Sequence, residues 1–324
     1  MRPDNDLDLS FAIEDRQPAR VPVAAPARVR LPLRVGARTL LTLERRLIRA
    51  PLPLERRELL PDLPALPNGA DGYLVTGLRA DLQLTMQARH AGLQPFVRQR
   101  YQRHFASLQD GFDSYFSHFS AKTRSTLKRK LRKLTDRSGG RLDVRSYARP
   151  DQVAEFYRHA RAVSATTYQE RLLGAGLPTG EGALAWMRDL AEKGEMRAWL
   201  LFLDGQPISY LFAPAEGDRL IYAFLGYHPA YSELSPGTVL QLEALRELME
   251  EGRFRFFDFT EGDGQHKRQF ATGSVDCLDL LLLRPTPVNL AVGHSLTLFD
   301  AAVARSKRGL AALGLSKLAR AARR

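Results

Sequence analysis

Apolar and polar residues alternate in several short stretches of the chain, and this alternation predicts β-strands. Successive side chains of a strand point to opposite faces of a sheet, so a half-buried strand needs this pattern. The predicted strands are two within residues 28–48, around a Val35-Gly36 turn, and residues 73–78, 96–105, 142–147, 196–203, 207–214, 219–226, 254–259 and 275–283.

Hydrophobic residues spaced by three or four positions predict helices between these strands. Leu127, Leu131 and Leu134 have this spacing in a long amphipathic helix predicted over residues 111–134, where Lys and Arg fill the other face. The other predicted helices are residues 81–91, with Asp81 near the N-cap, 152–163, 182–192 and 236–251, and two more between residues 287 and 324.

The order of these elements predicts the fold class. From residue 142 on, one strand and two helices precede a three-stranded meander with turns at Asp204-Gly205 and at residues 216–218. The helix over 236–251 then crosses over, which makes strand 254–259 parallel to strand 219–226. The predicted class is therefore α/β, with a mixed (α+β) sheet covered by helices.

Composition excludes several classes of protein. A chain of 324 residues suffices for one large domain or two ordinary ones, and 44% hydrophobic with 26% charged residues is typical of soluble proteins. No stretch reaches the roughly 18 apolar residues of a membrane helix. The N-terminal residues lack the pattern of a secretory signal, and the single cysteine, Cys277, excludes an internal disulfide. A cytoplasmic location is expected.

The formal net charge of +12 is concentrated in two segments. Residues 122–145 contain ten Lys and Arg against two Asp, and residues 301–324 contain seven Lys and Arg and no acid. Each segment alone is compatible with a solvated helix face. Together they exceed the net charge of the whole chain, which favours a polyanionic partner such as an anionic membrane, a phosphorylated substrate or nucleic acid.

The sequence Ser235-Pro236-Gly237 is the first candidate for chemistry. Ser235 suits an N-cap and Pro236 suits the first helical position, while Gly237 lets a ligand approach the backbone. Free N–H groups at such a helix start can bind a phosphate. An ordinary capped helix explains the same three residues equally well. The interpretation as a phosphate site therefore depends on the position of the helix directly after the meander.

The second candidate is residues 258–270, at the carboxyl end of a predicted parallel strand, where ligand clefts open. This polar segment combines three acids, a histidine and two bases with two glycines, and its simplest interpretation is a turn at residues 262–264. No His-x-x-x-His pair occurs, so no metal site is expected. Cys277 lies within a predicted strand and is expected to be a core residue.

Four motifs in one order resemble those of a known family. They are Ser120-Ala121-Lys122-Thr123-Arg124, Asp204-Gly205-Gln206-Pro207-Ile208, Ser235-Pro236-Gly237-Thr238-Val239-Leu240, and Asp258-Phe259 leading through Gly262-Asp263 to Lys267 and Phe270. With them, residues 112–284 resemble the GNAT-superfamily acyltransferases of the CelD-like, exopolysaccharide-associated branch, which are similar to Fem-type peptidoglycan aminoacyltransferases. The sequence departs from the family in lacking a glycine-doublet phosphate loop and in having His266 where tyrosine is usual.

The resemblance implies where an acyl donor would bind. In that family the strands before and after the crossover helix splay apart, and the thioester arm of the donor lies in the opening. Ser235, Gly237 and Thr238 would line the site of its phosphates, and Leu225 with Gly226 would flank the pantetheine arm. The donor would be an acyl-CoA or an acyl-carrier-protein thioester, and no metal is implied.

The expected reaction is acyl transfer to an amine, or less readily a hydroxyl. A base must take a proton from the attacking ammonium, and Glu261 or His266 fits this role, with Asp258 as second choice. The oxyanion needs a donor, which is a strand amide near Leu225 or the ammonium of Lys267. By resemblance to Fem-type enzymes, Lys267 is the strongest single candidate.

Four parts of the chain are expected: a disordered leader at 1–26, an incomplete N-terminal GNAT-like domain at 27–110, a GNAT-like acyltransferase domain at 111–285 and a basic helical tail at 286–324. The acceptor is expected to be an amine of an envelope polysaccharide or of a lipid such as a sphingoid base. The basic tail suits peripheral contact with the inner membrane face, or packs on the core through its leucines.

Two rival functions stay open. One is a Fem-type transferase that uses aminoacyl-tRNA, or an RNA-binding protein, since the basic helix could follow phosphates. The other is a scaffold that has lost its chemistry. The residues themselves do not determine the acyl length, the acceptor, the choice between CoA and carrier protein, or the oligomeric state.

Overall fold

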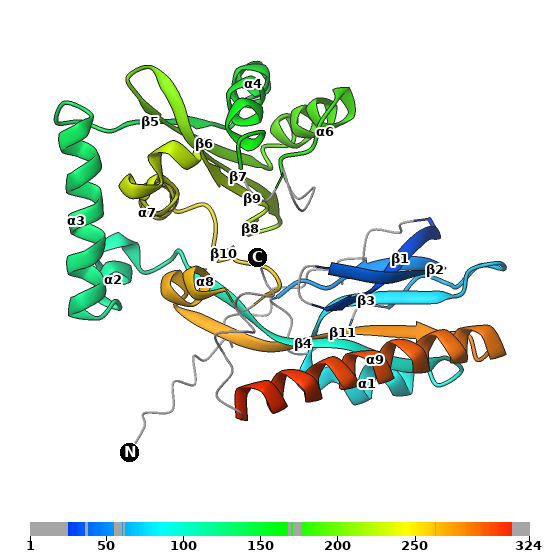
Figure 1. Cartoon of the computed structure of the whole chain (residues 1–324). Coiled ribbons are helices and arrows are strands. Elements are labelled where there is room, and N and C mark those ends of the chain that lie inside the picture. Colours follow the sequence, from blue (N-terminus) through cyan, green and yellow to red (C-terminus); the bar gives the residue numbers. More distant parts are fainter. Residues whose placement is uncertain are drawn as a thin grey trace. The chain divides into compact units, whose positions relative to one another are not determined.

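The computed structural model describes residues 25–35, 38–54, 60, 62–167, 170, 176–262 and 264–312 (Figure 1). The chain forms two compact units: one comprises residues up to 100 together with those from 276 on, and the other comprises residues 101–275. Both parallel and antiparallel strand pairs occur, and helices cover the sheets, so the predicted mixed α/β class is confirmed.

The first unit contains a mixed sheet. Its strands are β1 (Ala27–Val35), β2 (Arg38–Pro51), β3 (Gly72–Arg79), β11 (Gly273–Leu283) and the first part of β4 (Gln94–Ser107). β1 pairs antiparallel with β2, as the alternation over residues 28–48 predicted. β2 pairs parallel with β3, and β3 pairs antiparallel with β11. β11 carries Cys277, which is buried as expected.

Helices cover both faces of this sheet. Leu281 and Leu283 of β11 pack against Val292 and Leu296 of α9 (Pro287–Ala312), which runs along the sheet in Figure 1. The alternate residues Leu278, Leu280 and Leu282 point to the other face, where Met86 of α1 (Gln83–Arg89) joins them. The even and odd residues of one apolar strand thus build two separate cores, as the two-residue period of a strand requires.

Two predictions for this unit need correction. Asp81 does not cap a helix: it lies within the 3-10 turn η1 (Ala80–Leu82) and pairs with Arg79 at 2.7 Å, and α1 starts after Leu82 without a side-chain cap. A single helix, α9, covers the described residues from 287 to 312, where two helices were predicted over 287–324. Residues 1–24 and 313–324, predicted as leader and as part of the basic tail, lie outside the described residues.

The second unit contains the meander. Its strands are β5 (Asp143–Tyr147), β6 (Met196–Leu203), β7 (Gln206–Glu216), β8 (Arg219–Ile221), β9 (Phe224–Tyr227), β10 (Phe256–Asp258) and the end of β4. β5, β6 and β7 pair antiparallel in that order. The single strand predicted over 219–226 is interrupted, and its two halves, β8 and β9, pair with different parts of β7. β10 pairs parallel with β8, as the crossover predicted.

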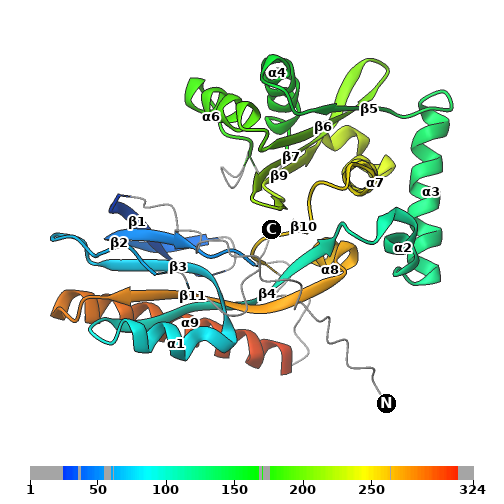
Figure 2. The same cartoon turned by 180° about the vertical axis from the view of Figure 1, so that it is seen from behind.

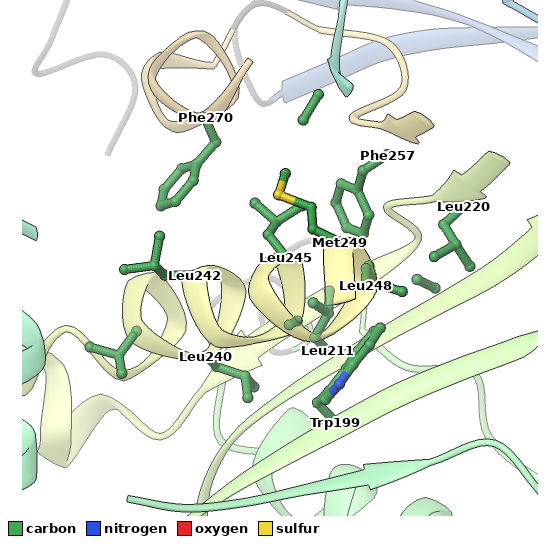
Figure 3. Packing of buried hydrophobic residues seen from close by; sticks show 14 of the residues in the cluster. Trp199, Leu211, Leu220, Leu240, Leu242, Leu245, Leu248, Met249, Phe257 and Phe270 are labelled. Atoms are coloured by element: carbon green, nitrogen blue, oxygen red, sulfur yellow. The ribbon is translucent and has the colours of Figure 1, made fainter. Parts of the chain in front are cut away.

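The helices of the second unit lie on opposite faces of the meander (Figure 2). The 3-10 turn η2 (Pro150–Gln152) leads into α4 (Val153–Ser164), which with α6 (Glu181–Glu192) packs on alternate residues of β6 such as Leu200. The crossover helix α7 (Pro236–Glu251) covers the other face, where Trp199 and Leu211 lie. Figure 3 shows leucines of α7 pointing both toward Trp199 and toward Phe257 and Phe270. α7 is therefore buried on more than one side.

Two predictions about helices in this unit were wrong in detail. The long helix predicted over 111–134 is two helices, α2 (Gly111–Ser117) and α3 (Ala121–Arg137). Ser120 separates them: its backbone is extended, and its hydroxyl accepts the N–H of Thr123 at 3.2 Å to cap α3. The polar segment after β10 contains a helix that was not predicted, α8 (Gln265–Phe270).

Candidate functional site

The strands on either side of α7 diverge. β8 and β10 are paired over three residues each, and the N–H of Tyr222 donates to the carbonyl of Asp258 at 2.8 Å just beyond them. From there β9 continues along β7, while the N–H of Phe259 donates to the backbone carbonyl of His104 in β4 at 3.0 Å. The splay expected between the strands before and after the crossover helix thus begins at Tyr222 and Asp258.

Aromatic rings gather at the point of divergence. The ring of Tyr222 lies 6.0 Å from that of Phe257, 5.7 Å from Phe259 and 5.9 Å from His266 between centroids. Burial raises the pKa of the Tyr222 phenol. Burial, and then the charge of Lys267, lower the pKa of His266. His266 is consequently neutral near pH 7 and can accept a proton.

Lys267 is the cation of this site, and α8 positions it. Its ammonium donates to the carbonyl of Glu261 and lies 3.5 Å from Oγ1 of Thr260. Burial lowers the pKa of Lys267, while the charges of Glu261 and Asp258 act in the opposite direction. A half-buried ammonium held beside a backbone carbonyl is suited to stabilise negative charge that develops nearby.

α8 is fixed in place by its last residue. Phe270 is 2% exposed and packs in the core of α7, with its ring directed toward Leu242 in Figure 3. The hydroxyl of Tyr115 in α2 donates to the carbonyl of Phe270 at 2.8 Å, and Phe119 contacts its ring. These contacts hold a short helix that would be unstable alone, and they set the position of His266 and Lys267.

Asp258 is fully buried and is held by two partners. Nε of Arg103 in β4 donates to both carboxylate oxygens of Asp258, at 3.1 Å and 3.0 Å, and Nη2 also donates to Oδ2. Oδ1 also accepts the N–H of Thr260 at 2.8 Å, and Thr260 has a left-handed backbone with φ of 61°. These partners give Asp258 a positioning role: it ties β10 to β4 and shapes the turn that leads to Glu261.

The start of α7 differs from the expected capped helix. Ser235 occupies the N-cap position, but its backbone is left-handed, with φ of 53°, and its side chain makes no cap hydrogen bond. Pro236 stands at the first helical position, as predicted. The N–H groups of Thr238 and Val239 both donate to the carbonyl of Ser235, at 3.0 Å and 3.2 Å. The helix start therefore offers fewer free N–H groups than the sequence predicted.

β9 lies directly against this helix start. A Cβ added to the buried Gly237 would lie 3.0 Å from Cδ2 of Leu225 and 3.4 Å from Cδ1 of Tyr227. A Cβ on Gly226 would instead meet the ring of Tyr210 at 2.5 Å. Leu225 and Gly237 thus pack against each other, which by itself explains a glycine at position 237, whereas Gly226 is turned toward Tyr210 in β7.

The two serine caps give a testable contrast. We expect Ser235→Ala to change the free energy of unfolding by less than about 0.5 kcal/mol, because no cap bond is lost. Ser120→Ala removes a formed cap and should cost about 1 kcal/mol. Urea denaturation of both variants measures the difference. A larger loss in Ser235→Ala than in Ser120→Ala would contradict the assignment of the caps.

The sequence reasoning missed three residues that border this site: Tyr222, Arg103 and Lys130. Lys130 of α3 donates to Oγ1 of Thr238 at 3.4 Å, which brings the basic helix to the start of α7. The position of Tyr222 just before the divergence could have been inferred from the predicted strand order. Arg103 pairs with a residue 155 positions away, and no local signal reveals such a partner.

Comparisons with known proteins agree with this geometry. Residues 121–268 match the family described as Acetyltransferase (GNAT) domain. No curated protein matches the chain. Among solved structures, FemX has a TM-score of 0.51 at 10% identity, over 69% of this chain and 75% of FemX. The C-terminal domain of a putative lysylphosphatidylglycerol synthetase from Agrobacterium fabrum has a TM-score of 0.49 at 15% identity, over 72% of this chain and 73% of that domain.

The fold is accordingly GNAT-like, and the predicted GNAT superfamily is confirmed for residues 121–268. The chain carries a GNAT-type acyltransferase domain, which implies an acyl donor and an acceptor. At such low identity the likeness to FemX concerns the fold alone. Within the described residues, no helix has the length and apolar character needed to span a membrane, and no cluster of His, Cys, Asp and Glu could hold a metal ion.

Proposed function

We propose that this chain transfers an acyl group from a thioester donor to an amine, at the divergence of β9 from β10. The observation that carries the proposal is the divergence itself, which begins at Tyr222 and Asp258 and has the neutral imidazole of His266 and the desolvated ammonium of Lys267 beside it. A GNAT-type domain over residues 121–268 supports the same reaction class.

His266 acts as the base in this proposal. An ammonium has no lone pair, so a proton must leave before the nitrogen can attack the thioester carbonyl carbon. Imidazole nitrogen with a lowered pKa accepts this proton directly or through one water. The charge of Glu261 raises the pKa of Lys267, so in this proposal its carboxylate helps to keep that ammonium protonated.

Lys267 stabilises the tetrahedral intermediate. As the C–N bond forms, the carbonyl electron pair moves to oxygen, and the ammonium of Lys267 or a strand amide near Leu225 donates to that oxyanion. Attack leaves the nitrogen positively charged, and it loses a second proton to solvent. Collapse of the intermediate then breaks the C–S bond and releases a thiolate, which takes up the proton held by His266. Asp258 does not touch the reacting atoms in this scheme: through Arg103 and Thr260 it positions the turn before α8.

The donor in this proposal is an acyl-CoA or an acyl-carrier-protein thioester. Leu225 and Gly226 flank its pantetheine arm, and Ser235, Gly237 and Thr238 lie beside its phosphates. The support for this placement is the position of these residues at the end of β9 and in the first turn of α7.

The acceptor in this proposal is an amine of an envelope polysaccharide or of a lipid, reached at the inner membrane face. Much of the basic segment 301–324 lies outside the described residues, so the support for a lipid acceptor is its sequence. Co-sedimentation with anionic vesicles, with and without residues 301–324, tests this point. Binding that survives the truncation would remove the tail from the proposal.

Release of free thiol tests the reaction. The full chain is incubated with acyl-CoA donors of different chain length, with and without glucosamine-type and sphingoid-type amines, and the thiol is measured with a chromogenic disulfide. Amine-dependent thiol release with a matching acylated product is expected. Absence of product with every CoA and carrier-protein donor would overturn the proposal.

A second candidate is a transferase or binding protein directed to RNA. It is favoured by the exposed cations of α3, such as Lys128, Arg129 and Arg132. Neutralising phosphates releases counterions, so RNA binding would weaken steeply with salt. Measuring RNA affinity between 50 and 200 mM salt (about 10³-fold loss for six contacts) tests this candidate, and a flat response would exclude it.

A further inference from the structure

A cavity of about 500 Å³ lies between α3 and the 3-10 turn η3 (Pro229–Leu234), which leads into α7. We call it the α3–η3 cavity. Its lining residues are Lys133, Arg137, Leu203, Ala230, Tyr231, Glu233 and Leu234. The volume lies within the range of small-molecule sites, about 300–1,000 Å³. Two cations, one ring and one acid line it, a combination typical of a site for an anionic ligand with an apolar part.

Lys133 and Arg137 each form a weak, exposed ion pair. The ammonium of Lys133 donates to the carbonyl of Glu233 at 3.3 Å and lies 4.0 Å from its carboxylate. Arg137 pairs with Asp204 at 3.0 Å. The side chains of Glu233 and Asp204 are 77% and 63% exposed, and such surface pairs contribute about 0–1 kcal/mol. An incoming phosphate can therefore replace these carboxylates at little cost.

One face of α3 connects this cavity to the start of α7. Lys130, Lys133 and Arg137 are spaced i, i+3 and i+7, so they lie on the same side of the helix. Lys130, at one end of this row, donates to Oγ1 of Thr238 in the first turn of α7. A ligand with several phosphates could thus contact the first turn of α7 and the cavity at the same time.

The backbone at the start of α7 is poorly equipped to bind those phosphates alone. Pro236 has no N–H, and the N–H groups of Thr238 and Val239 are already engaged by Ser235. The sequence also lacks a glycine-doublet loop before the helix. Lys130 contacts the first turn of α7, and Lys133 and Arg137 line the cavity, so these side chains would supply the missing positive charge.

We propose that the α3–η3 cavity binds the phosphorylated nucleoside end of the acyl donor, with Lys133 and Arg137 contacting its phosphates and Tyr231 its base. The inference rests on the proposed function for the class of donor, and it favours a CoA-type thioester. A cavity of this size accommodates a nucleotide, whereas a carrier protein would dock on an open surface and leave the cavity unused.

Adenosine 3′,5′-bisphosphate, which carries no acyl group, is the probe. Calorimetric titration of the full chain is expected to show binding that weakens about tenfold or more in Lys133→Gln/Arg137→Gln, since each charge-assisted bond contributes that order of affinity. The matched control, Lys128→Gln/Arg132→Gln, removes two charges from the opposite side of α3 and should change affinity less than about twofold. Glu233→Gln should tighten binding, because it removes the competing carboxylate.

Equal weakening in the two double variants would overturn the inference, since the helix would then attract the probe by net charge alone. Absence of binding to the unaltered chain would overturn it as well. A second measurement separates it from the proposed function: thiol release from acyl-CoA is compared with release from acyl-pantetheine, which lacks the nucleotide. A much lower KM for acyl-CoA, lost in Lys133→Gln/Arg137→Gln with kcat unchanged, is expected.

Equal KM values for the two donors would overturn the nucleotide site and leave the transferase intact. If neither donor releases thiol while probe binding still depends on Lys133 and Arg137, the cavity stands as a nucleotide site and the proposed reaction fails. The two proposals can therefore fail independently.

Discussion

Lys267→Ala should lower the turnover of amine-dependent thiol release by about 10²–10³, the loss typical of one oxyanion donor. The ammonium lies half-buried beside Thr260 and the carbonyl of Glu261, where a charge acts more strongly than in water. Arg268→Ala, which removes a charge from the next and exposed position of α8, is the control and should retain most activity. Near-normal turnover of Lys267→Ala in a folded protein would exclude this role.

The pH profile of the unaltered enzyme distinguishes the two polar groups of α8. His266 must be neutral to accept a proton, so kcat/KM should rise with pH through a pKa that burial has placed below the ordinary histidine value. Lys267 must be protonated, so the rate should fall again at a pH below the ordinary lysine pKa. Lys267→Arg should move the falling limb to higher pH, because guanidinium keeps its proton. An unchanged falling limb would assign it to another group.

Arg103→Ala should lower the free energy of unfolding by about 3–5 kcal/mol. It removes the ion-pair partner of Asp258, whose side chain is 0% exposed, and leaves the buried carboxylate without its guanidinium, with the N–H of Thr260 as the remaining donor described above. Urea denaturation followed by circular dichroism measures the loss. Because a typical protein has only about 5–15 kcal/mol of stability, the variant can fail to fold.

A double variant keeps this prediction testable. Arg103→Met/Asp258→Leu replaces both charges by apolar groups of similar size and should recover most of the stability. Arg149→Ala breaks an ion pair with Asp151 whose side chains are 67% and 68% exposed, and it should leave the denaturation midpoint almost unchanged. If Arg103→Ala behaves like Arg149→Ala, the ion pair does not support the turn that leads to Lys267.

The elements with a strong hydrophobic period were predictable from sequence. The helices predicted over 152–163, 182–192 and 236–251 agree with α4, α6 and α7 within a few residues. Their buried faces repeat every three or four positions, so the local pattern and the final packing require the same structure. The parallel pairing of β8 and β10 followed from the crossover rule, which depends on chain order alone.

The interruptions were harder to predict. The separation of α2 from α3 is marked locally by Ser120, a residue type that is favoured at N-caps, so the cap could have been recognised. α8 has no such signal, because six residues are too few for a hydrophobic period and the helix depends on the burial of Phe270 by distant elements. The resemblance supplied Lys267 and His266, whereas their supports, Arg103 and Tyr115, come from far along the chain.

The second unit is an insertion within the first in terms of chain order, because β11 and α9 follow it while β1 to β3 precede it. During synthesis β3 is therefore made long before β11, its partner strand. The core around Ile48 and Val75 is complete only after Leu278, Leu280 and Leu282 have been synthesised. Residues 101–275 are contiguous in the chain, so we expect the second unit to fold before the first is complete. A premature stop before β11 would leave β3 without its antiparallel partner, and the open strand edge would favour aggregation.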